Sequence, residues 1–144
     1  MLLRVHWRYM KANNFDSFEA VITFVIYIAL QDKKFSDQEK SELFIDIPLI
    51  RKFYFDCYGE FIKFDAMSQV KEIEKLVRSK DFLFEDQVGS KEQKFISDIL
   101  KESQTRTLAL LIARHVAESD GFALGEKTKF HHWMNYFSQL EFQI

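Results

Sequence analysis

The chain contains few of the residues that interrupt helices. Its 144 residues include one proline and four glycines. An all-β architecture needs many turn residues, so this scarcity argues against one and favours long helices. The length suits a single domain with a sizeable hydrophobic core. We therefore predict an all-α fold in one domain over residues 1–144, with its core at about residues 15–140.

Three further absences narrow the class of protein. The single cysteine, Cys57, cannot form a disulfide within the chain, which fits a reducing compartment. The formal net charge of −2 gives no basic excess for a phosphate backbone and argues against a nucleic-acid partner. Charged residues interrupt the segment from Met1 to Arg8, so it does not resemble a signal peptide. We expect a cytoplasmic protein.

The longest apolar run, from Ala20 to Leu30, predicts a buried central helix. It is shorter than the stretch of about 20 apolar residues that crosses a bilayer. Thr23 and Tyr27 also lower its hydrophobicity. We expect no transmembrane segment, which leaves a peripheral association with a membrane open.

Hydrophobic periodicity and capping residues predict about seven helices. Three of them begin with a capping box, and Asp65 is the expected cap of the helix at 65–78. The single proline, Pro48, suits the first turn of a new helix rather than a helix interior. The segment at 81–89 is irregular and predicts a loop. The predicted helices cover approximately residues 16–31, 36–45, 48–58, 65–78, 90–102, 104–119 and 125–140, with boxes at Asp16/Glu19, Ser36/Glu39 and Ser90/Gln93.

A short acidic pattern occurs in both halves of the chain. In the first half an apolar helix leads into Asp32, and Glu39 stands in the first turn of the next helix. In the second half an apolar helix leads into Asp120 and Gly121, and Glu126 follows at the start of the last helix. If the two helix–turn–helix units pack as a pair with two-fold symmetry, their four carboxylates meet.

Two interpretations of these turns are open. Carboxylate oxygens are the ligands of hard cations such as Ca²⁺ and Mg²⁺, which predicts a metal site of Asp32, Glu39, Asp120 and Glu126. In the structural alternative each aspartate forms a turn with nearby backbone N–H groups, and Glu39 completes a capping box. Neither turn contains the Asp-x-Asp-x-Asp-Gly series of an EF-hand.

The doubled pattern resembles the TerB-like tellurite-resistance family, in which an apolar helix leads into Ala-x-x-Asp-Gly and then a glutamate. The matching segments here are Ala29 to Glu39 and Ala117 to Glu126, and the resemblance covers approximately Phe15 to Leu140. It implies an all-α fold with internal two-fold similarity, an acidic surface proposed to bind metal ions, and no enzymatic activity. It also implies a role in stress or tellurite response through protein complexes near the inner membrane.

The chain departs from the family pattern at specific positions. Lys33 occupies the glycine position of the first copy, and Lys34 follows it, so two ammonium groups offset the charge of that turn. In the second copy Glu126 lies one position closer to its aspartate than Glu39 does in the first copy, and no serine occupies the position of Ser36. If one half binds a cation, these differences favour the half with Asp120.

The sequence context of the other candidate residues favours structural roles for them. His115 lies on the apolar face of a predicted helix, so we expect a buried, hydrogen-bonded histidine rather than a ligand. The adjacent His131 and His132 point about 100° apart on a helix and cannot easily share a metal. The chain has no phosphate loop, nucleophile motif or Cys-x-x-Cys pair, so an enzyme is the least favoured class.

The aromatic residues indicate a protein partner. Phe82 and Phe84 fall in the predicted loop, where side chains are often exposed, so they are the first candidates for a partner surface. The aromatic stretch at 53–64 is expected to be mostly core, with Cys57 as a packed thiol within it. We therefore expect an interaction module, with or without a metal; its oligomeric state stays open.

Overall fold

The computed structural model describes residues 15–141 of the chain. Within this range the chain forms six α-helices, two short 3-10 helices and no strand, so the all-α prediction is confirmed. The two ends of the predicted domain, including Met1 to Arg8, lie outside the described residues. No helix in the described range combines the length and the apolarity needed to cross a membrane. The elements are α2 (Phe18–Ala29), η1 (Leu30–Asp32), α3 (Asp37–Tyr58), α4 (Ala66–Arg78), η2 (Asp81–Phe84), α5 (Ser90–Ile99), α6 (Ser103–Glu118) and α7 (Leu124–Glu141).

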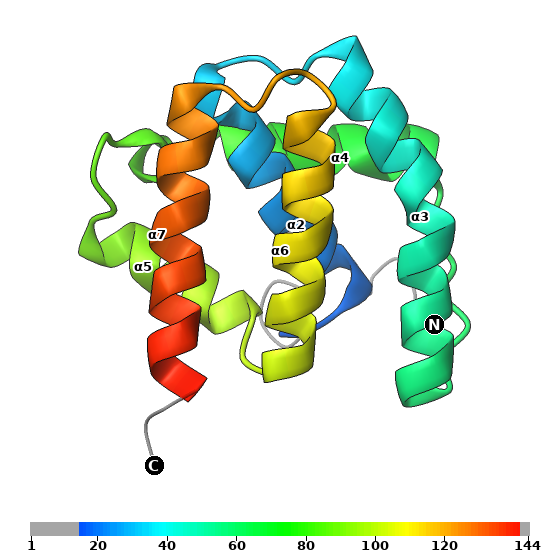
Figure 1. The fold of residues 1–144 in the computed structure, drawn as a ribbon. Helices are drawn as coiled ribbons and strands as arrows, with labels where there is room; N and C mark the ends of the chain where they lie inside the picture. The colour runs from blue at the N-terminus through cyan, green and yellow to red at the C-terminus, as the bar shows by residue number, and fades with distance from the viewer. Residues whose placement is uncertain (1–14, 142–144) are drawn as a thin grey trace.

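Helix α2 is the centre of the fold, as the apolar run predicts. All twelve of its residues are buried, and it packs against α6, α4, α3 and α7 (Figure 1). A helix that is apolar all round is stable only when other elements surround it. Its polar side chains find partners inside the core, because the Thr23 hydroxyl donates to the Glu19 carbonyl at 2.7 Å and the Tyr27 hydroxyl donates to the Glu92 carboxylate.

Helix α3 joins two of the predicted helices into one helix of 22 residues. The capping box at its start is confirmed: Ser36 Oγ accepts the Glu39 N–H at 3.1 Å, and Glu39 Oε1 accepts the Ser36 N–H at 3.1 Å. The prediction that Pro48 begins a new helix is wrong. Proline removes one helical hydrogen bond, but Pro48 is exposed, and the buried side chains of Leu43 and Ile50 on either side hold the helix in place.

The predicted capping box at Asp16 is also wrong. Ser17 caps α2 instead, and its hydroxyl oxygen accepts an N–H of the first turn at 3.0 Å. The carboxylate of Asp16 points to another part of the chain, where Oδ1 accepts the N–H groups of Lys101 at 2.7 Å and Glu102 at 3.0 Å and the hydroxyl of Thr105. Asp16 therefore holds the two residues that precede α6, and a hydroxyl in its first turn, rather than capping α2.

The segment at 81–89 is more ordered than a simple loop. It contains η2, whose Leu83 is buried, and both Phe82 and Phe84 are half-buried against the core. The expectation that these two rings form an exposed partner surface is therefore wrong. At the end of the segment Gly89 takes the cap position of α5, so Ser90 is the first helical residue rather than the cap.

Candidate functional site

The two acidic turns lie at the same end of the molecule. In Figure 1 the cyan connection between α2 and α3 and the orange connection between α6 and α7 run side by side at the top of the view. The 3-10 helix η1, which ends in Asp32, packs against the beginning of α7. The expected meeting of the two turns is therefore present in the fold.

The two turns also share a backbone conformation. Lys33 has φ 75° and Gly121 has φ 89°, so the residue after each aspartate is left-handed. Lys33 N–H donates to the Leu30 carbonyl at 2.8 Å, and Gly121 N–H donates to the Glu118 carbonyl at 3.2 Å. Lys33 thus adopts the conformation for which the pattern has glycine, at a cost of about 1 kcal/mol.

The glutamates that follow the turns face each other. Each is the third residue of its helix, α3 for Glu39 and α7 for Glu126, and their exposed fractions are 0% and 1%. Glu126 Oε1 accepts the Ala123 N–H at 2.8 Å, in the same way as Glu39 Oε1 accepts the N–H of its cap. The two Oε2 atoms are buried without any other donor, and the carboxyl groups contact each other.

The electrostatics of this pair are unusual. Burial disfavours the charged form of a carboxyl group and is the largest cause of the raised pKa of both residues. The hydrogen bond and charge of Glu39 add to it and raise the pKa of Glu126 to about 9. The raised pKa of Glu126 favours its protonated form at neutral pH. A cation is the other species that can stabilise two facing carboxylates.

The two aspartates surround the glutamate pair. The charges of Asp32 and Asp120 both raise the pKa of Glu39, which places all four predicted carboxylates in one region. Asp32 Oδ1 accepts the Lys34 N–H at 3.0 Å, so this aspartate also forms the turn of the structural interpretation. Asp120 is exposed. Glu39 and Glu126 are thus the inner pair, and the aspartates lie further out.

Gly125 allows the turns to approach each other. A Cβ atom built at this position would lie 3.0 Å from the backbone oxygen of Gln31 in η1. This is tighter than most Cβ contacts in proteins, so a side chain here requires the Gln31 backbone to move by a few tenths of an ångström. Gly125, the second residue of α7, therefore lies directly against the first turn.

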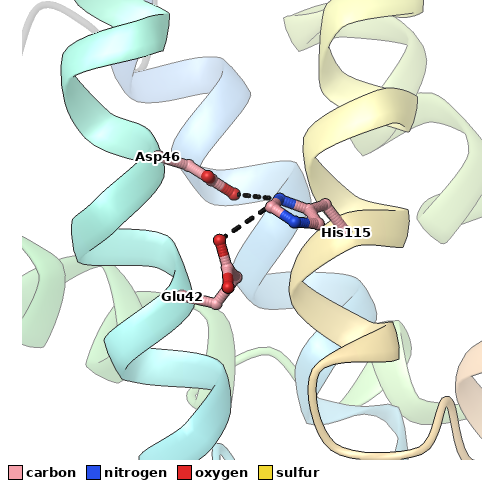
Figure 2. Close-up of side chains that lie close together, drawn as sticks. All are labelled: Glu42, Asp46 and His115. Atoms are coloured by element: carbon pink, nitrogen blue, oxygen red, sulfur yellow. Dashed lines mark hydrogen bonds and ion pairs between the residues drawn. The ribbon is translucent and has the colours of Figure 1, made fainter.

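A second group of ligand-type side chains lies between α3 and α6. Glu42 and Asp46 stand one turn apart on α3, and both face His115 of α6 (Figure 2). His115 Nδ1 lies 2.8 Å from Asp46 Oδ2 and 3.3 Å from Glu42 Oε2. The expectation of a buried histidine is wrong, because 56% of the His115 side chain is exposed, although the ring is hydrogen-bonded as expected.

Sequence reasoning misses Glu42 and Asp46. Their spacing of four residues places them on one face of a helix, but no local signal indicates which helix that face meets.

The remaining histidines and the cysteine differ in their exposure to solvent. His131 is exposed and His132 is half-buried, while Cys57 is exposed and not the packed thiol that its aromatic neighbours predict.

A buried polar network joins α2, α5 and α7. Lys129 Nζ and the Tyr27 hydroxyl both donate to the Glu92 carboxylate, and Trp133 Nε1 donates to the Tyr27 oxygen at 2.8 Å. Lys129 Nζ also donates to the Leu83 carbonyl at 3.2 Å. The ammonium and carboxylate charges compensate each other, so this network has a structural role in the core.

Comparison of the chain with known families, curated proteins and solved structures found no match. The resemblance to the TerB-like family therefore stays a prediction from the residues of the two acidic turns.

Proposed function

We propose that this chain is a non-enzymatic, TerB-like helical domain that binds a divalent cation at its paired acidic turns. The observation that carries the proposal is the buried contact between Glu39 and Glu126, whose Oε2 atoms have no other donor. Two buried carboxyl groups do not face each other at low cost unless a proton or a cation lies between them.

The internal two-fold similarity of the domain belongs to the same proposal. The turns share a left-handed residue after the aspartate, at Lys33 and Gly121. Each is followed by a glutamate that is the third residue of its helix and accepts an N–H from the preceding residues. These correspondences support a duplicated helix–turn–helix unit, with the glutamate pair lying between its two copies.

The chemistry of the donors favours a hard cation. All four side chains offer oxygen only, which suits Ca²⁺ or Mg²⁺. Glu39 and Glu126 would hold the ion directly, while Asp32 and Asp120 add negative charge at the same end of the molecule. Binding releases the shared proton, because a metal ligand must be deprotonated. The affinity should therefore rise with pH.

Calorimetric titration and thermal melting with Ca²⁺ and Mg²⁺ test the proposal. We expect both ions to raise the melting temperature, with a larger rise at pH 8 than at pH 6. Asp32→Asn combined with Asp120→Asn, or Glu126→Gln alone, should weaken binding about tenfold or more. Asp37→Asn is the matched control, since Asp37 is an exposed carboxylate in the first turn of α3. A flat titration of the unmodified chain contradicts the cation site.

The alternative is the same domain without a metal. It is favoured by the pKa of Glu126, which at about 9 lets a proton satisfy the pair at neutral pH. In that case the turns are structural, and the domain acts only by binding other proteins. The titration distinguishes the two, because this alternative predicts no response to either ion.

A protein-interaction role is part of both versions. Helix α3 lies at the edge of the molecule (Figure 1), and its outer side carries the exposed apolar side chains of Phe44, Ile45, Leu49 and Phe55. Phe61, also exposed, packs on Phe55 with ring centroids 4.8 Å apart. These exposed apolar side chains on α3 support a protein partner. The role of that partner in a stress or tellurite response is proposed from the TerB-like resemblance alone. Co-purification from the native cell, with identification of bound proteins and metals, tests this role.

A further inference from the structure

Glu42, Asp46 and His115 converge on one point between α3 and α6 (Figure 2). Each offers one ligand atom, and these three atoms all lie within 4.8 Å of one another. Within residues 15–141 this is the one group of three or more His, Cys, Asp or Glu side chains that comes so close. It shares no residue with the pair of Glu39 and Glu126, although Glu39 lies about one turn before Glu42 on α3.

The three side chains differ in their access to water. Asp46 has an exposed fraction of 1%, Glu42 is half-buried, and His115 reaches the surface. The buried side of the cluster is thus fixed by the packing of α3 against α6, and its outer side is open to small molecules. A site of this kind can hold an ion and keep further coordination positions for water.

A hydrogen bond between His115 and Asp46 does not account for the cluster. One N–H at Nδ1 can donate to one carboxylate, and Asp46 at 2.8 Å takes that role. Glu42 at 3.3 Å then brings a second negative charge to the same nitrogen. Glu118 is a further acidic neighbour that raises the pKa of His115, although Arg114 pairs with it at 2.9 Å. The cluster therefore carries an excess of negative charge.

The two distances from His115 are close to those between neighbouring ligands of a metal ion. With metal–ligand bonds of about 2.1 Å, adjacent ligand atoms lie about 3.0 Å apart in octahedral and about 3.4 Å apart in tetrahedral coordination. The separations of 2.8 and 3.3 Å from His115 Nδ1 to the two carboxylates fall near this range, and all three ligand atoms lie within 4.8 Å of one another. A ligand set of one imidazole and two carboxylates suits Zn²⁺ or a similar divalent transition metal.

We propose that Glu42, Asp46 and His115 form a site for a divalent transition metal, with Zn²⁺ as the expected ion. His115 binds through Nδ1, and the two carboxylates bind through the oxygens that now face it. Water completes the coordination on the exposed side. The nitrogen ligand separates this site from the all-oxygen glutamate pair, so the two are expected to prefer different ions.

Calorimetric titration of the full chain with Zn²⁺ at pH 7.5 tests the site, with the ¹⁵N shifts of His115 followed by NMR. We expect tight binding of one ion that shifts the His115 ring nitrogens. Both His115→Gln and Glu42→Gln should weaken that binding about tenfold or more. Glu42→Gln keeps the hydrogen bond between His115 and Asp46, so it tests the ligand role even if His115→Gln disturbs the fold.

Three control variants keep the interpretation specific. His131→Gln removes an exposed histidine of α7, and Cys57→Ser removes the exposed thiol of α3. Glu126→Gln disables the glutamate pair. All three should bind Zn²⁺ as the unmodified chain does. The proposal is overturned if Zn²⁺ fails to bind, or if Glu42→Gln and His115→Gln bind it with unchanged affinity.

Discussion

Glu126 keeps a proton at a pH at which an ordinary glutamate has lost it, because burial and the neighbouring Glu39 carboxyl raise its pKa to about 9. An unfolded glutamate releases its proton near pH 4.5. Between these values the folded chain binds a proton that the unfolded chain does not. Its stability should therefore fall as the pH rises through this range, by up to about 1.4 kcal/mol per pH unit.

Glu126→Gln isolates this contribution. A carboxamide can donate a hydrogen bond to Glu39 without titrating, so the free energy of unfolding should fall less steeply between pH 5 and pH 9 in the variant. Asp46 and His115, whose pKa values are also raised, contribute equally to both proteins. Urea unfolding at a series of pH values, without divalent cations, measures the difference. Equal slopes in the two proteins would contradict a shared proton.

Single residues show which hydrogen bonds a sequence can predict. The bonds between Ser36 and Glu39 join residues three apart, so the pattern Ser-x-x-Glu is sufficient to predict them. Asp16 begins a similar pattern, but its carboxylate bonds to N–H groups at least 85 positions away. The sequence around Asp16 contains no signal that indicates such a long-range partner.

At the level of elements, the contact between η1 and the beginning of α7 crowds the position that a Cβ atom would take at Gly125. We expect Gly125→Ala to destabilise the protein by about 1 kcal/mol or more, since a crowded Cβ outweighs the better helix propensity of alanine. Gly89→Ala is the control, because no atom lies within 4 Å of its added Cβ. Thermal or urea unfolding measures both variants. A neutral Gly125→Ala would show that the turns are not tightly packed.

The observed bounds of the helices lie close to the ranges predicted from the sequence, except at Pro48. The sequence predicts α4, α6 and α7 from apolar positions at helical spacing, and each lies close to its expected range. Local propensity places a break at Pro48, but tertiary packing overrides it, because α3 is anchored on both sides of the proline. The energy of that packing is distributed over α2 and α6, which no local pattern describes.

For the whole molecule, Asp16 links the beginning of α2 to the beginning of α6. We expect Asp16→Ala to destabilise the fold by about 2–3 kcal/mol, because it leaves the N–H groups of Lys101 and Glu102 without their acceptor. Asp16→Asn should cost much less, since an amide oxygen still accepts and asparagine tolerates the φ of 59°. Chemical unfolding measures both, with the exposed Asp86→Ala as control. Equal losses for the two variants would refute the role of these hydrogen bonds in joining α2 to α6.

The arrangement of the whole molecule is partly predictable. The repeated acidic pattern predicts that two distant turns meet, and they do lie at one end of the fold. The cluster of Glu42, Asp46 and His115 is not predictable in the same way. Its residues belong to no repeat, and only the packing of α3 against α6 brings them together.

Helix α2 has no side that faces water. Surface helices tolerate many substitutions along their polar face. Helix α2 has no polar face, so substitutions at any of its positions change the core. Its twelve positions are therefore the part of the chain least free to diverge. In a comparison with a distant homologue, the α2 segment is therefore where an alignment should begin.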